Sequence, residues 1–221
     1  MLRSALRERV LQQVNDVLPT HWSTSQINDT IDDSLQFVAE QARPFKSSIQ
    51  LPLRAGKGFY FTSGLGPEVM APYRVYLVSD NRRLTASTLL ELDELMFDWT
   101  TTSSTGNPWI WIPISWDCFM IWPVPSAAGG ILQVDCLMWP RPMQDDNDEL
   151  EINESDVEAV IDYTVFDALL KRFDVDAAKA HASRMEHSFA NLQAIHGGEK
   201  IFSKMYTRLA LNLPMGLPRR E

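Results

Sequence analysis

The 221-residue chain has few cysteines, no long hydrophobic run and a shortage of positive charge. Cys118 and Cys136 are too few for a secreted disulfide scaffold or for a four-thiolate metal site. No stretch reaches about 18 consecutive apolar residues, so the sequence predicts no membrane-spanning helix. Twenty Lys and Arg against 29 Asp and Glu give a net charge of −9. This balance disfavours a general binder of the nucleic-acid backbone and a polybasic membrane anchor, because both need a basic surface.

Motifs for catalysis are also missing. The sequence contains no HExxH, CxxC, nucleophile elbow or phosphate-binding glycine loop. His181 and His187 stand six residues apart, which is not the i, i+4 spacing of helical metal ligands. The acidic clusters at residues 32–33 and 145–149 are predicted to be solvated surface, since a glycosidase-like pair needs a rigid cleft. We therefore expect no catalytic, metal or cofactor site.

The remaining composition is that of an ordinary globular protein, with 45% hydrophobic and 22% charged residues. Residues 1–9 are amphipathic and charged, and they lack the uninterrupted apolar core of a signal peptide. The sequence therefore predicts a protein that is made in a cytoplasm and stays reduced there.

Two helices are predicted at the start of the chain. The first covers residues 4–18, with an apolar stripe that Pro19 ends. Its stripe consists of Leu6, Val10, Val14 and Val17. Residues 23–26 (Ser-Thr-Ser-Gln) fit a capping box for the second helix, with Trp22 and Ile27 at the positions of a hydrophobic staple. Its buried stripe consists of Ile27, Ile31, Leu35 and Val38, and Arg43-Pro44 closes it.

The middle of the chain has the pattern of short strands. They are predicted at residues 49–53, 58–62, 73–78, 109–114, 117–122 and 131–139, with a short helix at 87–96 capped by Ser87 and a polar loop at 100–107. The last two strands are predicted to form a hairpin around residues 126–130. One apolar face would then carry Cys118, Met120, Trp122, Leu132, Val134, Cys136 and Met138. The hairpin would bring Cys118 near Cys136, favouring two buried thiols over a disulfide or metal pair.

The third part of the chain returns to the helical pattern. Asn153 is a plausible N-cap, and the following helix has an inward face of Val157, Val160, Ile161, Thr164, Val165, Ala168 and Leu169. A break at Phe173-Asp174 begins the last helix, which Gly197-Gly198 ends. Its stripe consists of Ala178, His181, Met185, Phe189 and Leu192.

These elements predict an α+β fold in which a β-rich domain is inserted into a helical bundle built from both ends of the chain. The bundle would comprise residues 1–46 and 151–198, and the inserted domain residues 47–140. Residues 141–150 would be an acidic linker. Such an insertion is sterically easy, because chain termini commonly lie close together at a domain surface.

Residues 199–221 are too apolar for a solvated tail, and Pro214 and Pro218 forbid a long helix. We expect this tail to dock on its own core or on another subunit. The candidate interface residues are Phe202, Met205, Tyr206, Leu209, Leu211, Leu213 and Met215.

Four segments carry patterns that recur in one protein family. They are the helix start at residues 22–27, the strand and proline run at 117–125, the approach to a helix with a central Asp-Tyr at 150–168, and the closing helix with Ala180, Arg184 and Phe189. Through these segments, residues 20–196 resemble the head-to-tail connector proteins of tailed bacteriophages, also called adaptor or neck proteins.

The resemblance implies a structural virion protein without catalytic residues. Such adaptors form a ring under the dodecameric portal protein, extend the DNA channel and supply the platform for the tail. The expected partners are the portal protein, neighbouring copies in a ring of twelve, and a tail or nozzle protein. DNA would pass through the lumen without sequence-specific binding, along a wall that we expect to be net negative. The expected location is the virion neck, after assembly in the bacterial host cytoplasm.

Two other functions remain open. One is a different neck or tail-completion protein of the phage. The other is a carbohydrate-binding module or small glycoside-acting enzyme with a tryptophan platform. Trp109, Trp111, Trp122 and Trp139 alternate with aliphatic residues, which favours core and interface positions over that platform.

Overall fold

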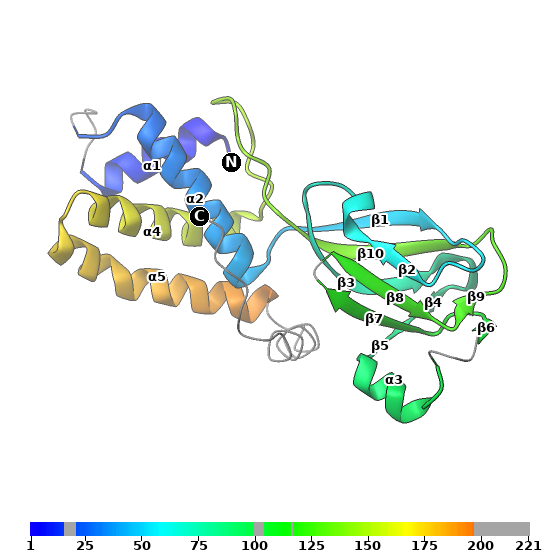
Figure 1. Cartoon of the computed structure of the whole chain (residues 1–221). Coiled ribbons are helices and arrows are strands. Elements are labelled where there is room, and N and C mark those ends of the chain that lie inside the picture. The colour runs from blue at the N-terminus through cyan, green and yellow to red at the C-terminus, as the bar shows by residue number, and fades with distance from the viewer. Residues whose placement is uncertain (16–20, 100–103, 116, 197–221) are drawn as a thin grey trace, which may run out of the picture. The chain divides into compact units, whose positions relative to one another are not determined.

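The computed structural model describes residues 1–15, 21–99, 104–115 and 117–196 (Figure 1). The fold is mixed α+β, as predicted. The chain divides into two compact units. The helical unit comprises Met1–Phe45 and Trp139–Gly198, and the β unit comprises Lys46–Met138 among the described residues.

Four helices form the helical unit: α1 (Arg3–Gln13), α2 (Thr24–Ala42), α4 (Glu154–Lys171) and α5 (Val175–His196). The predicted capping box of α2 is confirmed. The Ser23 hydroxyl accepts the Gln26 N–H at 3.2 Å, and the Gln26 side chain accepts the Ser23 N–H at 2.9 Å. The first helix ends earlier than residue 18, because Asn15 adopts a left-handed conformation with φ of 58°. Val17 and Pro19 lie outside the described residues.

Helix α4 contacts α1, α2 and α5. All seven residues predicted for its inward face are buried. Phe37 of α2 stacks on Tyr163 of α4 with ring centroids 4.2 Å apart, and Phe189 of α5 meets Phe37 edge-on at 5.3 Å. The predicted break before α5 is confirmed at Phe173, whose φ is 63°. On the predicted stripe of α5, Ala178, Phe189 and Leu192 are buried, and His181 and Met185 are half-buried.

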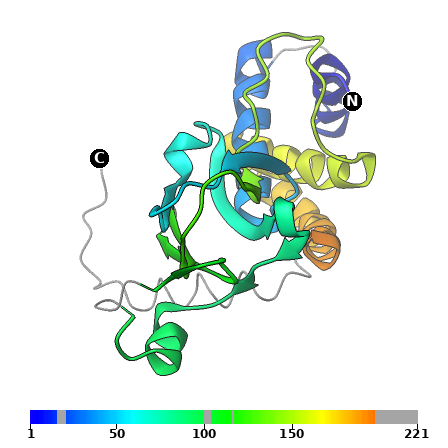
Figure 2. The ribbon, with the colours of Figure 1, turned by 90° about the vertical axis from the view of Figure 1, so that its right-hand side faces the viewer.

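The β unit contains two four-stranded sheets, which Figures 1 and 2 show as separate layers. One has the order β1 (Lys46–Pro52), β10 (Ile131–Met138), β3 (Val69–Leu77) and β4 (Arg82–Arg83). The other has the order β2 (Phe59–Phe61), β8 (Cys118–Trp122), β7 (Ile110–Ser115) and β5 (Thr85–Ala86). The short strands β6 (Thr105–Gly106) and β9 (Val124–Pro125) pair in parallel. Two 3₁₀ turns, η1 (Thr62–Gly64) and η2 (Val78–Asp80), complete the unit with α3 (Leu89–Leu95).

The two sheets share one hydrophobic core. It contains Leu53, Tyr60, Val75, Leu77, Leu84, Trp111, Phe119, Ile121, Leu132, Val134 and Cys136. The opposite face of the second sheet packs in a separate cluster around Leu92 of α3, with Ile110, Ile112, Met120 and Trp122. Both faces of β8 are therefore buried.

The predicted hairpin between residues 117–122 and 131–139 is wrong. Strand β8 pairs with β7 and β2, whereas β10 pairs with β1 and β3. Residues between them include β9, which pairs with β6 and makes the connection too long for a tight turn. Because β8 is apolar on both faces, its sequence pattern does not distinguish one face from the other. The shared apolar face that the hairpin prediction relied on was therefore not evidence for pairing with β10.

The two cysteines consequently lie in different sheets, and both are free, buried thiols. Burial raises the pKa of the Cys136 thiol to about 12 and also raises the pKa of the Cys118 thiol. This agrees with the interpretation as two buried thiols, although the pairing that suggested their proximity is wrong.

The cap of the short helix α3 also differs from the prediction. Thr88, rather than Ser87, is the N-cap, and its hydroxyl accepts the Glu91 N–H at 3.2 Å. The Glu91 carboxylate accepts the Thr88 N–H at 3.0 Å and the Ser87 hydroxyl at 2.9 Å. Ser87 thus donates a further hydrogen bond to the Glu91 carboxylate of the capping box.

Candidate interaction surfaces

The acidic segment before α4 is fixed against α1. Leu2 and Glu149 form an isolated antiparallel bridge, and the Arg3 and Ser4 N–H groups donate to the Asp148 and Asp146 carbonyls at 2.9 and 3.1 Å. The two sequence segments of the helical unit are therefore joined by main-chain hydrogen bonds.

The carboxylates of this segment lie mostly at the surface, as predicted, and two of them also make specific contacts. Arg7 binds Asp146 through two hydrogen bonds, of 2.6 and 2.9 Å, and this contact lowers the pKa of Asp146. The Asp148 carboxylate accepts the Asp145 and Gln144 N–H groups at 2.9 and 2.7 Å. These main-chain donors lower the pKa of Asp148.

Arg3 makes the most buried charged contact of the segment. Arg3 is 6% exposed, and its guanidinium donates to the Met143 carbonyl and lies 3.0 Å from a carboxylate oxygen of Asp32 on α2. Burial raises the pKa of Asp32, and the attraction of Arg3 opposes that rise. Asp32, predicted as solvated surface, therefore has a structural partner.

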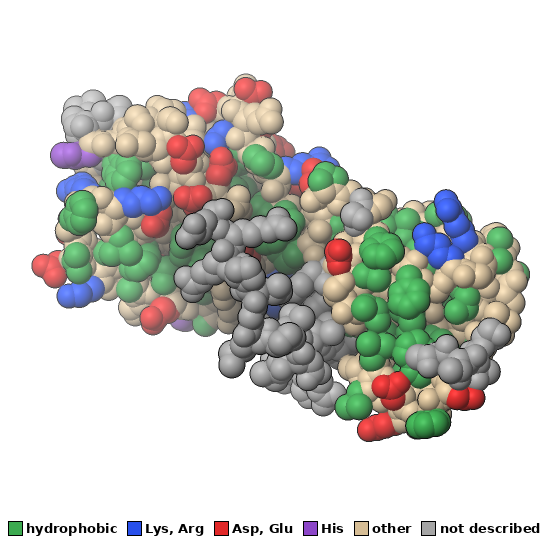
Figure 3. Space-filling model, in the orientation of Figure 1, with side chains coloured by type: hydrophobic (Ala, Val, Ile, Leu, Met, Phe, Trp, Pro, Cys, Tyr) green, Lys and Arg blue, Asp and Glu red, His purple; other side chains and the backbone are tan. Residues whose placement is uncertain are grey.

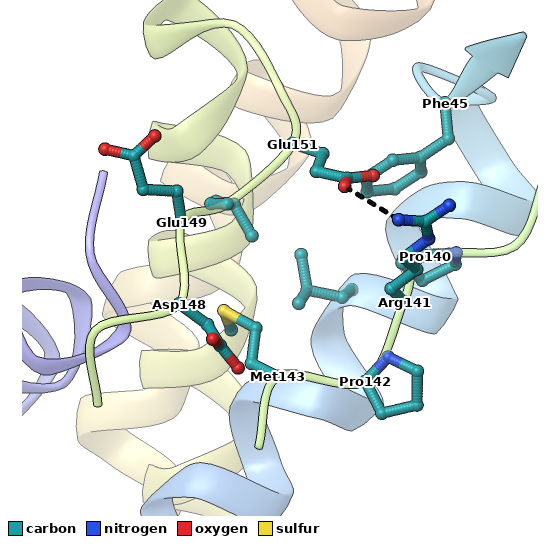
Figure 4. Close-up of a pocket in the computed structure, with 10 residues that line it drawn as sticks. Phe45, Pro140, Arg141, Pro142, Met143, Asp148, Glu149 and Glu151 are labelled. Carbon is teal, nitrogen blue, oxygen red and sulfur yellow. Dashed lines mark ion pairs between the residues drawn. The ribbon is translucent and has the colours of Figure 1, made fainter. Parts of the chain in front are cut away.

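This anchored segment forms one wall of a groove of about 440 Å³ within the helical unit (Figure 4). The groove is lined by Leu35, Phe45, Pro140, Arg141, Pro142, Met143, Asp148, Glu149, Leu150 and Glu151. Arg141 and Glu151 point toward each other, with 3.8 Å between Nη1 and Oε1 (Figure 4). The lining is therefore mixed, with apolar side chains beside charged ones.

A second charged cluster joins α4 to α5. The Asp162 carboxylate is almost fully buried, lies 2.9 Å from Arg184 Nε and accepts the Ser188 hydroxyl at 2.5 Å. His196 Nε2 lies 2.7 Å from Asp156 Oδ2. No group of three or more metal-ligating side chains occurs within the described ranges. These pairs therefore fix the two helices together.

Apolar side chains are exposed on the β unit, where Figure 3 shows hydrophobic residues gathered on one face. Phe59 and Phe61 of the end strand β2 are 48% and 55% exposed. Leu90, Leu95 and Phe97 are exposed in and after α3. These exposed residues were not predicted from the sequence, although the Phe-Tyr-Phe alternation of β2 is a signal that indicates them. Exposed clusters of this kind commonly mark contacts with other proteins.

The family model of the SU10 adaptor protein matches residues 1–203. The chain belongs to the SU10 adaptor protein family. The predicted resemblance to phage adaptor proteins is thereby confirmed, and the family is one of structural bacteriophage proteins. No curated protein matches the chain.

The candidate interface residues of this adaptor lie outside the described part of the chain. They are Phe202, Met205, Tyr206, Leu209, Leu211, Leu213 and Met215.

His181 and His187 lie on α5, the first half-buried and the second exposed. None of the helices in the described part is long and apolar enough to cross a bilayer.

The four tryptophans that alternate with aliphatic residues differ in burial. Trp111 and Trp122 are buried on opposite faces of the second sheet. Trp109 and Trp139 are about two-fifths exposed, the first in the β unit and the second in the helical unit. This distribution fits core and surface contacts, as the alternation predicted.

Proposed function

We propose that the chain forms an adaptor ring between the portal and the tail of a phage virion, extends the DNA channel and provides the tail attachment platform. The observation that carries this proposal is the family match over residues 1–203. The ring would contain twelve copies, matching the portal. The helical unit would contact portal and neighbouring copies, and the β unit would make lateral or tail contacts.

The charge distribution supports a channel role. Residues 1–45 and 139–198, which make up the helical unit, contain nine Lys and Arg against 19 Asp and Glu. An acidic wall repels the phosphate backbone, whereas a basic wall would bind it in a strongly salt-dependent way. We therefore place the helical unit's acidic surface toward the lumen, so that DNA passes without being retained.

The C-terminal residues have the opposite charge. Residues 199–221 contain five Lys and Arg against two Asp and Glu, together with the seven apolar candidate residues. A basic, apolar segment is suited to an apolar groove with an acidic rim on portal or on a neighbouring copy. We propose that Phe202, Met205, Tyr206, Leu209, Leu211, Leu213 and Met215 form this portal or neighbour interface.

The decisive experiment mixes the purified chain with the portal protein of the same phage and images the product by electron microscopy with rotational averaging. A portal-capped ring of twelve copies with an acidic lumen is the expected result. A chain that ignores portal but joins a more distal part of the neck would instead identify it as another neck or tail-completion protein. A ring whose lumen is lined by Lys and Arg would overturn the channel argument.

Truncation after Gly198 tests the C-terminal interface separately. Lost portal binding with an unchanged melting temperature supports docking to another subunit. A large drop in melting temperature means that the segment packs on its own core, which would contradict this part of the proposal.

A further inference from the structure

Strand β2 leaves an open hydrogen-bonding edge. Among the residues that the structure describes, it is an end strand of its sheet and pairs with β8 alone. The Thr62 N–H donates to the Asp117 carbonyl at 2.7 Å, and the Ile121 N–H donates to the Gly58 carbonyl at 2.8 Å. Even-numbered residues therefore bond to β8. In an antiparallel pair the alternate residues point the other way, so the main-chain groups of Phe59 and Phe61 face the open edge.

The side chains of this strand divide in the same way. Tyr60 points into the shared core, where it stacks on Phe119 with ring centroids 5.5 Å apart. Phe59 and Phe61 lie opposite Met120 and Cys118, on the outer face of the sheet. About half of each phenylalanine side chain is exposed. An added strand would cover both the free main-chain groups and the two phenyl rings.

The other end strands of the two four-stranded sheets are protected within the described part of the chain. Strand β1 carries Lys46 and Gln50 and ends at Pro52, β4 consists of Arg82 and Arg83, and β5 has two residues. Charge, proline and short length are the usual devices that prevent strand addition. Strand β2 is also short, but its three residues include no charged residue and no proline, and its two outward phenylalanines are exposed, so it is the least protected of these end strands.

The sequence offers a matching donor strand beyond the last described helix. Leu209, Leu211, Leu213 and Met215 alternate with Ala210, Asn212 and Pro214, which is the period of a strand. The preceding residues Phe202, Met205, Tyr206 and Leu209 instead follow the i, i+3, i+4, i+7 spacing of a helix. The other segments outside the described residues, 16–20, 100–103 and 116, are too short to supply such a strand.

We propose that residues 209–213 of a neighbouring copy add to β2 as an antiparallel strand and thereby link copies around the ring. This inference rests on the proposed ring. Each copy would donate its segment and accept that of the next, which is the heterologous contact that closes a ring. The helical-period residues Phe202, Met205 and Tyr206 would remain for portal.

Two independent constraints agree on the antiparallel arrangement. Pro214, directly after the donor segment, has no N–H, so pairing continues past residue 213 only if even-numbered residues point away from β2. Odd-numbered residues then bond opposite Phe59 and Phe61, and directly opposed residues share a face. The leucines therefore fall on the face of the two phenylalanines. In a parallel arrangement, the donor residues that bond to β2 alternate with the residues directly opposite Phe59 and Phe61. Odd-numbered bonding residues would then place the leucines on the other face of the sheet from the two phenylalanines.

The first test measures binding of a synthetic peptide of residues 207–217 to the chain truncated after Gly198. Leu211→Pro removes an N–H that bonds to β2, and we expect it to weaken binding about fivefold to tenfold, the effect of losing about one main-chain hydrogen bond. Asn212→Pro removes an N–H that points outward, so its affinity should stay within about twofold of the parent. Equal loss for both variants would contradict the proposed parity.

The acceptor is tested in the full chain with Phe61→Lys, because a lysine on the edge opposes strand addition. Val78→Lys, at another exposed apolar residue of the same unit, is the matched control. We expect Phe61→Lys to abolish peptide binding in the truncated chain and ring formation in the full chain, and Val78→Lys to preserve both.

Hydrogen exchange then separates this inference from the proposed function. Amides of Phe59 and Phe61 should exchange slowly in the portal-bound ring and rapidly in the dilute free chain. A ring in which both amides exchange rapidly would leave the adaptor function intact and overturn the strand donation. Slow exchange of both amides in the free chain, independent of concentration, would show that residues 209–213 bind β2 of the same copy. That result would also overturn the proposed donation between copies. If no ring forms, the peptide assay still decides whether residues 207–217 bind β2.

Discussion

Arg7 on α1 binds Asp146 with both guanidinium Nη atoms, although 139 residues separate the two along the chain. This contact lies beside the main-chain bridge between Leu2 and Glu149, so side chains and main chain together join the start of the helical unit to the segment before α4. The β unit's residues come between the two in sequence. Closure of the helical unit therefore depends on contacts that span the whole insertion.

The Arg7–Asp146 contact predicts a pH-dependent contribution to stability. Because the pKa of Asp146 is lowered in the folded chain, its contribution is present above the unfolded pKa of about 4 and is lost as the pH falls through the lower folded value. Asp146→Asn should therefore lower the urea midpoint at pH 7, and the difference from the parent should shrink below about pH 4. The measurement is urea unfolding followed by tryptophan fluorescence.

Asp145→Asn is the matched control for this experiment. It removes a neighbouring exposed carboxylate from the same turn while leaving the Arg7 contact in place. We expect its urea midpoint to follow that of the parent at each pH. A difference between parent and Asp146→Asn that persists unchanged at low pH would contradict the electrostatic origin of the effect.

The helices were predictable because their signals are local. The capping box at Ser23, the stripe of α2 and the inward face of α4 depend on spacing within a few turns, and the structure has them as expected. The ends were less predictable, because Asn15 ends α1 by adopting a left-handed conformation that an apolar stripe cannot reveal.

Strand pairing and charge pairing were not predictable in the same way. The positions of the main strands follow from alternation, but β8 is buried on both faces, and its partners are β2 and β7 rather than β10. Asp32 and Asp146 belong to runs that have the composition of solvated surface, yet each pairs with an arginine of α1. These contacts join distant parts of the chain, so no local pattern indicates them.

Arg3 gives a prediction for a buried ion pair. Arg3→Met removes the partner of Asp32 and the donor to the Met143 carbonyl. Breaking a buried pair costs about 3–5 kcal/mol; because the Asp32 side chain is 30% exposed, we expect about 2–3 kcal/mol here. The loss should be smaller at low pH, since protonation removes the unpaired charge of Asp32.

A double-mutant cycle with Asp32→Asn isolates this interaction. If the pair is coupled, the free energy of unfolding of the double variant will exceed the value expected from adding the two single losses. Additive losses would show that Arg3 acts through Met143 and packing alone.

The capping box of α2 predicts a smaller and more local loss. Ser23→Ala removes the oxygen that accepts the Gln26 N–H, and such substitutions cost about 1 kcal/mol. Ser25→Ala, at an exposed position in the first turn, should change the free energy of unfolding by less than about 0.5 kcal/mol. Chemical denaturation of both variants measures the difference, and equal losses would argue against the cap.

The two cysteines predict a labelling pattern that checks the sheet assignment. Cys136 is fully buried with a pKa of about 12, so at pH 8 it should react with a thiol reagent only when the β unit opens. Cys118, 6% exposed, should react faster. Mild oxidation should not join them, because they lie on strands of different sheets that do not pair. Labelling of Cys118→Ser and Cys136→Ser measures each rate alone, and a Cys118–Cys136 disulfide formed in the folded chain would restore the rejected hairpin.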